Sequence, residues 1–220
     1  AGGRLYVMGG FLGADVFTNV YVMDLANPGA GWSEGVGLPQ AAQGGAAATL
    51  DGLIYHLGGA STGNVRHAGC WRFDPAHPEA GWTAISNLPT ARAWGGAGAA
   101  HGRLFFLGGY DTNVLSAVLS YDPASAGAGW VETAPLAQAA DSFGLAVANS
   151  RFYRVGGNNG ASDVAAAARG ELQTGVAPSH GPLAGGFRVD ISGAGLGDGG
   201  DITNVTLCGI QAVILTQRTD

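Results

Sequence analysis

The sequence predicts an all-β fold built from repeated antiparallel sheets, and three observations lead to this prediction. First, a short segment that ends in Gly-Gly occurs four times, with the first glycine of each pair at Gly9, Gly58, Gly108 and Gly156. Second, these glycines are 49, 50 and 48 residues apart, a period typical of repeat architectures. Third, no segment keeps the 3.6-residue periodicity of an amphipathic helix over ten or more residues.

One period contains four expected strands. The first two, at residues 45–50 and 53–59, flank Asp51-Gly52, a dipeptide that tolerates the positive φ angles of a tight hairpin. A third strand at 70–75 ends at a proline, and a fourth at 81–85 is followed by Leu88-Pro89 before the next repeat begins. We therefore expect four-stranded antiparallel sheets at about residues 44–86 and 95–133.

Two further markers recur with the glycines. An aromatic residue stands three positions before each pair, and an aspartate is followed eight residues later by a tryptophan in the first three repeats. The aromatic residues are Tyr6, Tyr55, Phe105 and Tyr153, and the aspartate–tryptophan pairs are Asp24 with Trp32, Asp74 with Trp82, and Asp122 with Trp130.

These markers resemble those of the Kelch family of β-propellers over about residues 3–157. The resemblance implies radial four-stranded blades whose recurring residues serve the architecture, with the tryptophans packed between blades and the glycines allowing close approach of the backbone. The residues to which it assigns this structural role are Gly9, Gly10, Gly58, Gly59, Gly108, Gly109, Gly156, Gly157, Trp32, Trp82 and Trp130.

The repeats do not add up to a closed propeller. The first copy, residues 4–10, corresponds to the second strand of a blade whose first strand is absent, and the expected aspartate and tryptophan are missing after Gly157. Propellers close with about four to eight blades. We expect either that the chain is a piece of a longer protein or that partial propellers associate to complete a ring.

The residue pattern changes in the C-terminal part of the chain. We therefore expect two domains, propeller blades at residues 1–174 and a second domain at residues 175–220. Apolar and polar residues alternate at 187–191, and further strands are expected at 204–208 and 212–216. Gly181-Pro182, Gly185-Gly186 and the segment 193–196 resemble the opening of an IPT/TIG domain, which implies the beginning of an immunoglobulin-like β-sandwich.

Composition argues against two classes of partner. The chain has ten basic residues, all of them arginine, against sixteen acidic ones, and its net charge is −6. A nucleic acid or an anionic membrane is therefore disfavoured on electrostatic grounds. No apolar run approaches the ~18 residues of a membrane span.

Few residues carry candidate chemistry. Cys70 is expected to be a small buried hydrophobe, and Cys208 to pair outside this chain, although a bond between the two stays open. Asn204 begins the N-x-S/T sequon Asn-Val-Thr and is the expected glycosylation site, on an outward strand face. Asp198 and Asp201 are a weak calcium candidate in a glycine-rich turn.

The sequence favours a non-enzymatic scaffold over an enzyme. No nucleophile, zinc-protease, phosphate-loop or paired-cysteine motif occurs, and no cofactor is expected. The five histidines, scattered without paired spacing, are His56, His67, His77, His101 and His180. We expect an extracellular or cell-surface protein that binds other proteins or glycans or takes part in filament or matrix assembly. Two alternatives stay open: a copper-radical oxidase similar to galactose oxidase, and an intracellular Kelch adaptor.

Overall fold

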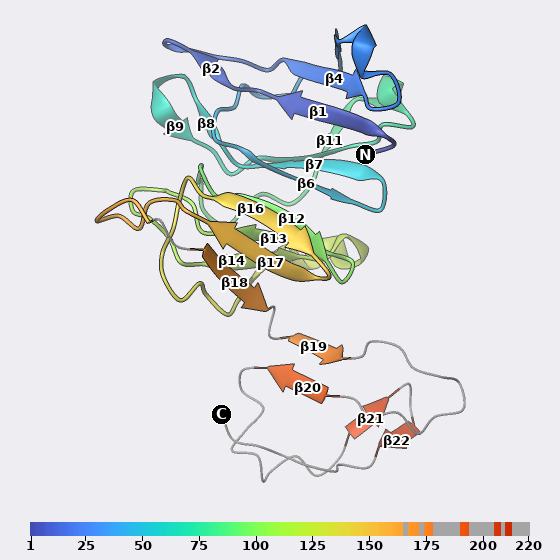
Figure 1. The fold of residues 1–220 in the computed structure, drawn as a ribbon, viewed down its shortest axis with the longest axis vertical. Coiled ribbons are helices and arrows are strands. Elements are labelled where there is room, and N and C mark those ends of the chain that lie inside the picture. The colour runs from blue at the N-terminus through green and yellow to red at the C-terminus, as the bar shows by residue number, and fades with distance from the viewer. Residues whose placement is uncertain (165–166, 172–173, 178–189, 194–204, 208–209, 213–220) are drawn as a thin grey trace. The chain divides into compact units, whose positions relative to one another are not determined.

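The computed structural model describes residues 1–164, 167–171, 174–177, 190–193, 205–207 and 210–212. The chain divides into two compact units, Ala1–Glu171 and Leu172–Asp220. Within the described residues, all extended structure is antiparallel, and the helices are short 3-10 turns, the longest being Pro123–Ala128. The all-β class predicted from the repeat is therefore confirmed (Figure 1). No helix in the described part of the chain is long and apolar enough to cross a membrane.

The described part of the first unit contains four main sheets, in the order of the chain. Two of them are four-stranded and lie where the sequence predicts them, and the sheets before and after them have three strands each. The first sheet comprises β1 (Arg4–Met8), β4 (Val20–Asp24) and β5 (Trp32–Glu34). The second comprises β6 (Ala46–Leu50), β7 (Leu53–Leu57), β10 (Cys70–Phe73) and β11 (Trp82–Ala84). The third comprises β12 (Gly96–Ala100), β13 (Arg103–Leu107), β14 (Val118–Tyr121) and β15 (Trp130–Thr133), and the fourth β16 (Gly144–Ala148), β17 (Arg151–Val155) and β18 (Ala167–Glu171).

Small hairpins follow the first two Gly-Gly pairs. They are β2 (Phe11–Leu12) with β3 (Asp15–Val16), and β8 (Ala60–Ser61) with β9 (Val65–Arg66), and both project on the same side of the unit (Figure 1). We call this side the loop end. In the described residues of the second unit, β19 (Thr174–Ala177) pairs with β20 (Asp190–Gly193) and β21 (Val205–Leu207) pairs with β22 (Ile210–Ala212).

The tight hairpins use the backbone conformation that their residues predict. In the turn between β6 and β7, Asp51 and Gly52 have φ angles of 51° and 80°. The equivalent turn between β12 and β13 places His101 and Gly102 at 51° and 71°. Positive φ at both central residues is the geometry whose twist matches that of the flanking strands.

The Gly-Gly pairs allow two segments of backbone to touch. Gly58 has a φ of 59°, and a Cβ added to it would lie 2.6 Å from the backbone oxygen of Arg92. The next residue, Gly59, donates its N–H to that same oxygen at 2.9 Å. Gly10 and Gly109 donate in the same way, at 2.8 Å each, to the residues that precede β6 and β16. The glycines are thus required where each sheet meets the start of the next one.

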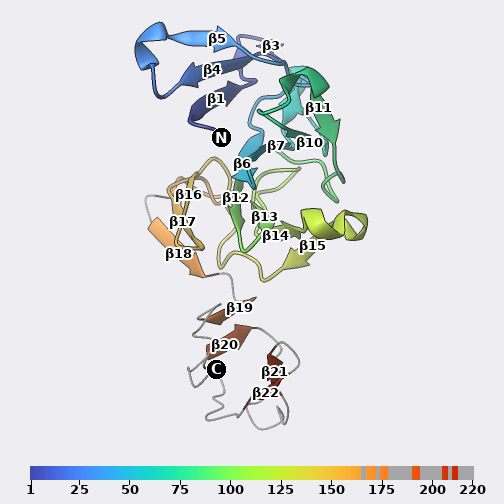
Figure 2. The same ribbon diagram turned by 90° about the vertical axis from the view of Figure 1, so that its right-hand side faces the viewer.

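Neighbouring sheets pack face to face, with the first strand of one against the first strand of the next: β6 contacts β12, and β12 contacts β16 (Figure 2). The largest core lies between the second and third sheets, where Tyr55 and Leu57 meet Leu104 and Phe106. A smaller core around Val20 joins the first sheet to the second.

The recurring tryptophans bridge neighbouring sheets, but not equally. Trp130 is 9 % exposed and donates its Nε1–H to the backbone oxygen of Ser86 at 2.8 Å, and Trp82, half-buried, donates to that of Val36 at 3.0 Å. The prediction of burial is wrong for Trp32, which is 47 % exposed. The physical reason is that no sheet in the described first unit lies against its face of the first sheet.

Candidate binding site

At the loop end, a row of backbone hydrogen bonds joins the segments that lead into β6, β12 and β16. Trp94 donates its N–H to the oxygen of Gly44 at 2.6 Å, and its own oxygen accepts from the N–H of Ser142 at 2.8 Å. The three residues occupy the same place in successive repeats and share positive φ angles of 60°, 57° and 53°. We call this row the backbone ladder. It holds three sheets in register at the loop end.

Trp94 is the unusual member of the ladder. A left-handed backbone is rare for a bulky residue and costs about 1–3 kcal/mol, and such strain persists where the surroundings impose it, often at functional sites. Its indole lies across Gly44, where an added Cβ would come within 2.5 Å of the indole Nε1. Glycine in the preceding repeat therefore makes the room that the tryptophan occupies.

Two further side chains extend this aromatic surface. The ring of Tyr110, which follows a Gly-Gly pair, lies with its centroid 6.1 Å from that of Trp94. The guanidinium carbon of Arg66, at the end of β9, lies 5.1 Å from the centre of the Tyr110 ring, within the range of a cation–π contact. All three side chains are partly exposed. We call these three residues the Trp94 platform.

Polar groups surround the platform. Gln43, next to the ladder, donates its side-chain N–H to the Oδ1 of Asn64 at 2.8 Å. Asp111 follows Tyr110, and its carboxylate accepts the backbone N–H of Asn113 at 2.8 Å, which lowers the pKa of that carboxyl. Amide groups and a carboxylate thus belong to residues that adjoin the platform or the ladder along the chain, or lie two positions away from it.

Two histidines that are eleven residues apart in the sequence come together between the first and second sheets. The ring of Trp71 lies between them, 6.1 Å from His56 and 5.9 Å from His67, centroid to centroid. Burial and, to a smaller extent, the nearby His67 together lower the pKa of His56 to about 4. Burial also lowers the pKa of His67, although the Ala41 backbone opposes this shift. The spacing of these two histidines in the sequence gave no sign that their rings come together.

The pair is not an evident metal centre. Among the described residues, no group of three or more histidine, cysteine, aspartate or glutamate side chains gathers where a metal ion would be held. Neither nitrogen of the His67 ring, nor Nδ1 of His56, makes a hydrogen bond of normal geometry. The neutral imidazoles instead pack as aromatic rings against Trp71.

A buried arginine stands beside the second Gly-Gly pair. Arg92 is 5 % exposed, and its guanidinium lies 6.0 Å from the centre of the Phe106 ring and donates through Nη2 to the hydroxyl of Thr90. Its Nε and Nη1 make no hydrogen bond. Burial lowers its pKa, and the more distant Asp111 and Glu132 oppose the shift. Because its free nitrogens are covered, Arg92 supports the loop end from within and does not offer a surface to a ligand.

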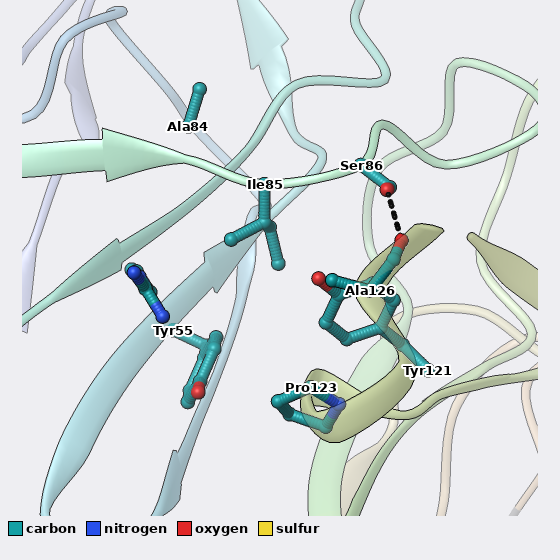
Figure 3. A pocket seen from close by; sticks show the side chains of 8 residues that line it. Tyr55, Ala84, Ile85, Ser86, Tyr121, Pro123 and Ala126 are labelled. Carbon is teal, nitrogen blue, oxygen red and sulfur yellow. Dashed lines mark hydrogen bonds between the residues drawn. The ribbon is translucent and has the colours of Figure 1, made fainter. Parts of the chain in front are cut away.

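A small cavity of about 170 Å³ lies between the second and third sheets, and none of the platform residues lines it (Figure 3). In it, the Ser86 hydroxyl donates to the backbone oxygen of Ala126 at 3.2 Å. Burial raises the pKa of Tyr55, and Arg72 opposes this shift. The cavity is lined by Tyr55, Arg72, Ala84, Ile85, Ser86, Tyr121, Pro123 and Ala126. Its walls are mostly inter-sheet packing residues, so it is a weaker candidate than the platform.

Several residues singled out in the sequence have no described surroundings. The glycosylation candidate Asn204, the calcium candidates Asp198 and Asp201, and Cys208 all lie outside the described residues. Cys70 is a free, fully buried cysteine whose thiol pKa is raised by burial to about 12, so the expectation of a buried hydrophobe is confirmed.

Sequence reasoning missed the platform altogether. One signal for it was present: the segment before the third sheet reads Ala-Trp-Gly-Gly, whereas the corresponding segment before the second sheet reads Gln-Gly-Gly-Ala. A tryptophan at a repeat position that holds glycine or serine in the neighbouring repeats marks a residue that the architecture does not require.

Comparison with known proteins places the chain by fold alone. No protein-family model matches the sequence, and no curated protein matches it. Among solved structures, the chain is similar to that of YjhT, with a TM-score of 0.59 and 16 % sequence identity over 69 % of this chain and 49 % of YjhT. The chain thus spans about half the length of that structure.

Proposed function

We propose that this chain is a non-enzymatic binding scaffold, a partial Kelch-type propeller that binds glycans through the Trp94 platform at its loop end. The observation that carries the proposal is the strained Trp94, held by the backbone ladder with its indole beside Tyr110. The propeller arrangement is supported by the repeated sheets, their face-to-face packing and the two tryptophan bridges.

The chemistry of the platform suits a sugar ring. Aromatic faces receive the C–H face of a sugar, while amides, a guanidinium and a carboxylate provide donors and acceptors for its hydroxyl groups. Gln43, Asn64 and Asp111 supply these polar groups beside the rings. A protein ligand is the other partner class that we expected, and the experiment below separates the two.

The test is a binding screen of the whole chain against neutral oligosaccharides, followed by titration calorimetry on the best ligand. Trp94→Gly is the informative variant, because glycine adopts the ladder's backbone without strain and removes only the indole. We expect it to weaken binding at least tenfold while thermal stability is kept. Trp32→Ala, which removes another half-exposed tryptophan, is the matched control and should bind normally.

Binding that Trp94→Gly leaves unchanged would refute the site. A chain that binds no oligosaccharide but captures a peptide through Trp94 would refute the ligand class and keep the site. Tyr110→Ala gives an independent check, since it removes the central ring of the platform.

We also propose that the protein acts outside the cell or at its surface, with the second unit as the beginning of an IPT/TIG-like domain. The support is the resemblance of that segment and the sequon at Asn204. The mass of a peptide spanning Asn204, from protein of its natural source, tests this proposal. An unmodified asparagine at full occupancy would remove the residue-level support for secretion.

A further inference from the structure

The first sheet is apolar on both faces, although only one face is covered. Residues of β1 and β4 alternate, so that Tyr6 and Val20 pack toward the second sheet. The alternate side chains of β1 and β4, together with Trp32 on β5, point to the opposite face of the sheet. They are about half exposed, at 46 %, 49 %, 45 % and 47 % for Leu5, Val7, Tyr21 and Trp32. We call these four residues the Trp32 face. A contiguous exposed apolar surface of this kind marks an interaction site.

The repeat shows what covers this face elsewhere in the chain. His56 and Phe106 occupy the position of Val7, two residues before a Gly-Gly pair, and are only 3 % and 0 % exposed. Phe106 packs in one core with Tyr55 and Leu57 of the preceding sheet. On the sheet face that carries His56, the ring of Phe73 meets Tyr6 of the first sheet at 6.5 Å between centroids. Trp82 and Trp130 occupy the position of Trp32, and each donates to a backbone oxygen two residues beyond the last strand of the preceding sheet. The Trp32 face therefore has the same residue pattern as the faces of the second and third sheets, each of which packs against the sheet before it.

The fourth sheet carries the complementary surface. In the second sheet, Tyr55 and Leu57 face the following sheet and are 2 % and 0 % exposed. Tyr153 and Val155 hold the same positions in β17, and there Val155 is 59 % exposed and Tyr153 is partly exposed. The described first unit thus presents one half of an inter-sheet interface at its first sheet and the other half at its fourth.

We propose that a second copy of this chain docks head to tail, with the outer face of its fourth sheet on the Trp32 face. Within the chain, the face equivalent to the Trp32 face packs twice against the outer face of a sheet of the same repeat. The fourth sheet has such an outer face, which carries Tyr153 and Val155. We therefore identify the occupant of the Trp32 face as the fourth sheet of a second copy. A pair that closes uses this contact twice, since each copy contributes one face of each kind.

The experiment measures the mass of the whole chain in solution by sedimentation equilibrium over a range of concentrations. We expect a reversible rise from the monomer mass of 22.0 kDa to twice that value. Val7→Glu and Val155→Glu should each abolish it, because each places a charge in both contacts of the pair. Circular dichroism confirms that each variant remains folded.

Two comparisons make the result specific. Val131→Glu is the matched control, since Val131 is 52 % exposed on β15 and belongs to neither face, and it should dimerise like the unmodified chain. An equimolar mixture of the Val7→Glu and Val155→Glu chains should regain a dimer, because one intact contact can form between them.

Other outcomes overturn the proposal. A chain that stays monomeric at every concentration refutes self-association. A dimer lost in Val7→Glu but kept in Val155→Glu would mean that two Trp32 faces meet each other, and a mixture that stays monomeric would refute the head-to-tail contact.

Discussion

Trp130 offers the sharpest test of the inter-sheet packing. Its indole is 9 % exposed, stacks at 5.2 Å from the ring of Tyr121, and donates to the Ser86 oxygen at 2.8 Å. Trp130→Ala removes this buried surface and leaves a cavity, so we expect a loss of about 3–5 kcal/mol in the free energy of unfolding. Trp130→Phe keeps an aromatic ring but leaves the Ser86 oxygen without its donor, at a cost of about 1–3 kcal/mol.

The assay is urea unfolding followed by circular dichroism, with Trp32→Ala as the comparison. Trp32 has the same repeat position but is half exposed, so its removal from the dilute monomer should cost less than about 1 kcal/mol. Equal losses for Trp32→Ala and Trp130→Ala would refute the reasoning, since burial against a preceding sheet would then not explain the stabilisation. If Trp32→Ala becomes more harmful as protein concentration rises, the additional loss belongs to the proposed dimer.

Three further predictions concern the interior. The pKa of His56 is lowered by burial from 6.5 to about 4, so the unfolded chain takes up a proton first as the pH falls. Stability should be complete above pH 6.5 and decline by about 3 kcal/mol toward pH 4, and His56→Phe should flatten this part of a stability–pH curve. Gly58→Ala should destabilise the fold far more than Gly52→Ala in thermal unfolding, because both have positive φ but only the former would press a Cβ against the Arg92 oxygen. Cys70 should resist thiol reagents until the protein is denatured, since its thiol is buried with a pKa of about 12; rapid labelling of the native protein would contradict this.

The repeat predicted the sheets because its markers act locally. A Gly-Gly pair, an Asp-Gly turn and a proline after a strand each determine the path of a few residues, and two complete repeats were enough to place two four-stranded sheets. The same markers do not predict which other sheet, if any, packs against a given sheet. Trp32 has the pattern of Trp82 and Trp130, but no sheet of the described first unit lies against it, so its exposure could not be predicted from the pattern.

The candidate site was beyond sequence reasoning for a related reason. The platform joins Arg66, Trp94 and Tyr110, which lie in two different repeats and carry no common motif. Likewise, His56 and His67 meet because the chain turns back through β8 and β9, a path that spacing alone does not reveal. Contacts between segments of this kind depend on the packing of whole sheets, which is decided by all their residues together.

The backbone ladder has a consequence for how such a surface can evolve. Its three members adopt nearly the same φ angle although one is glycine, one tryptophan and one serine. The neighbouring segments therefore impose the conformation, and at the second and third positions they accept side chains as different as those of tryptophan and serine. A lineage that duplicates this unit can exchange the residue at Trp94 or Ser142 and acquire a new selectivity without rebuilding the sheets beneath, whereas Gly44 has to stay glycine for as long as the Trp94 indole lies across it. These two positions are therefore a natural place to introduce diversity in a designed library of binders.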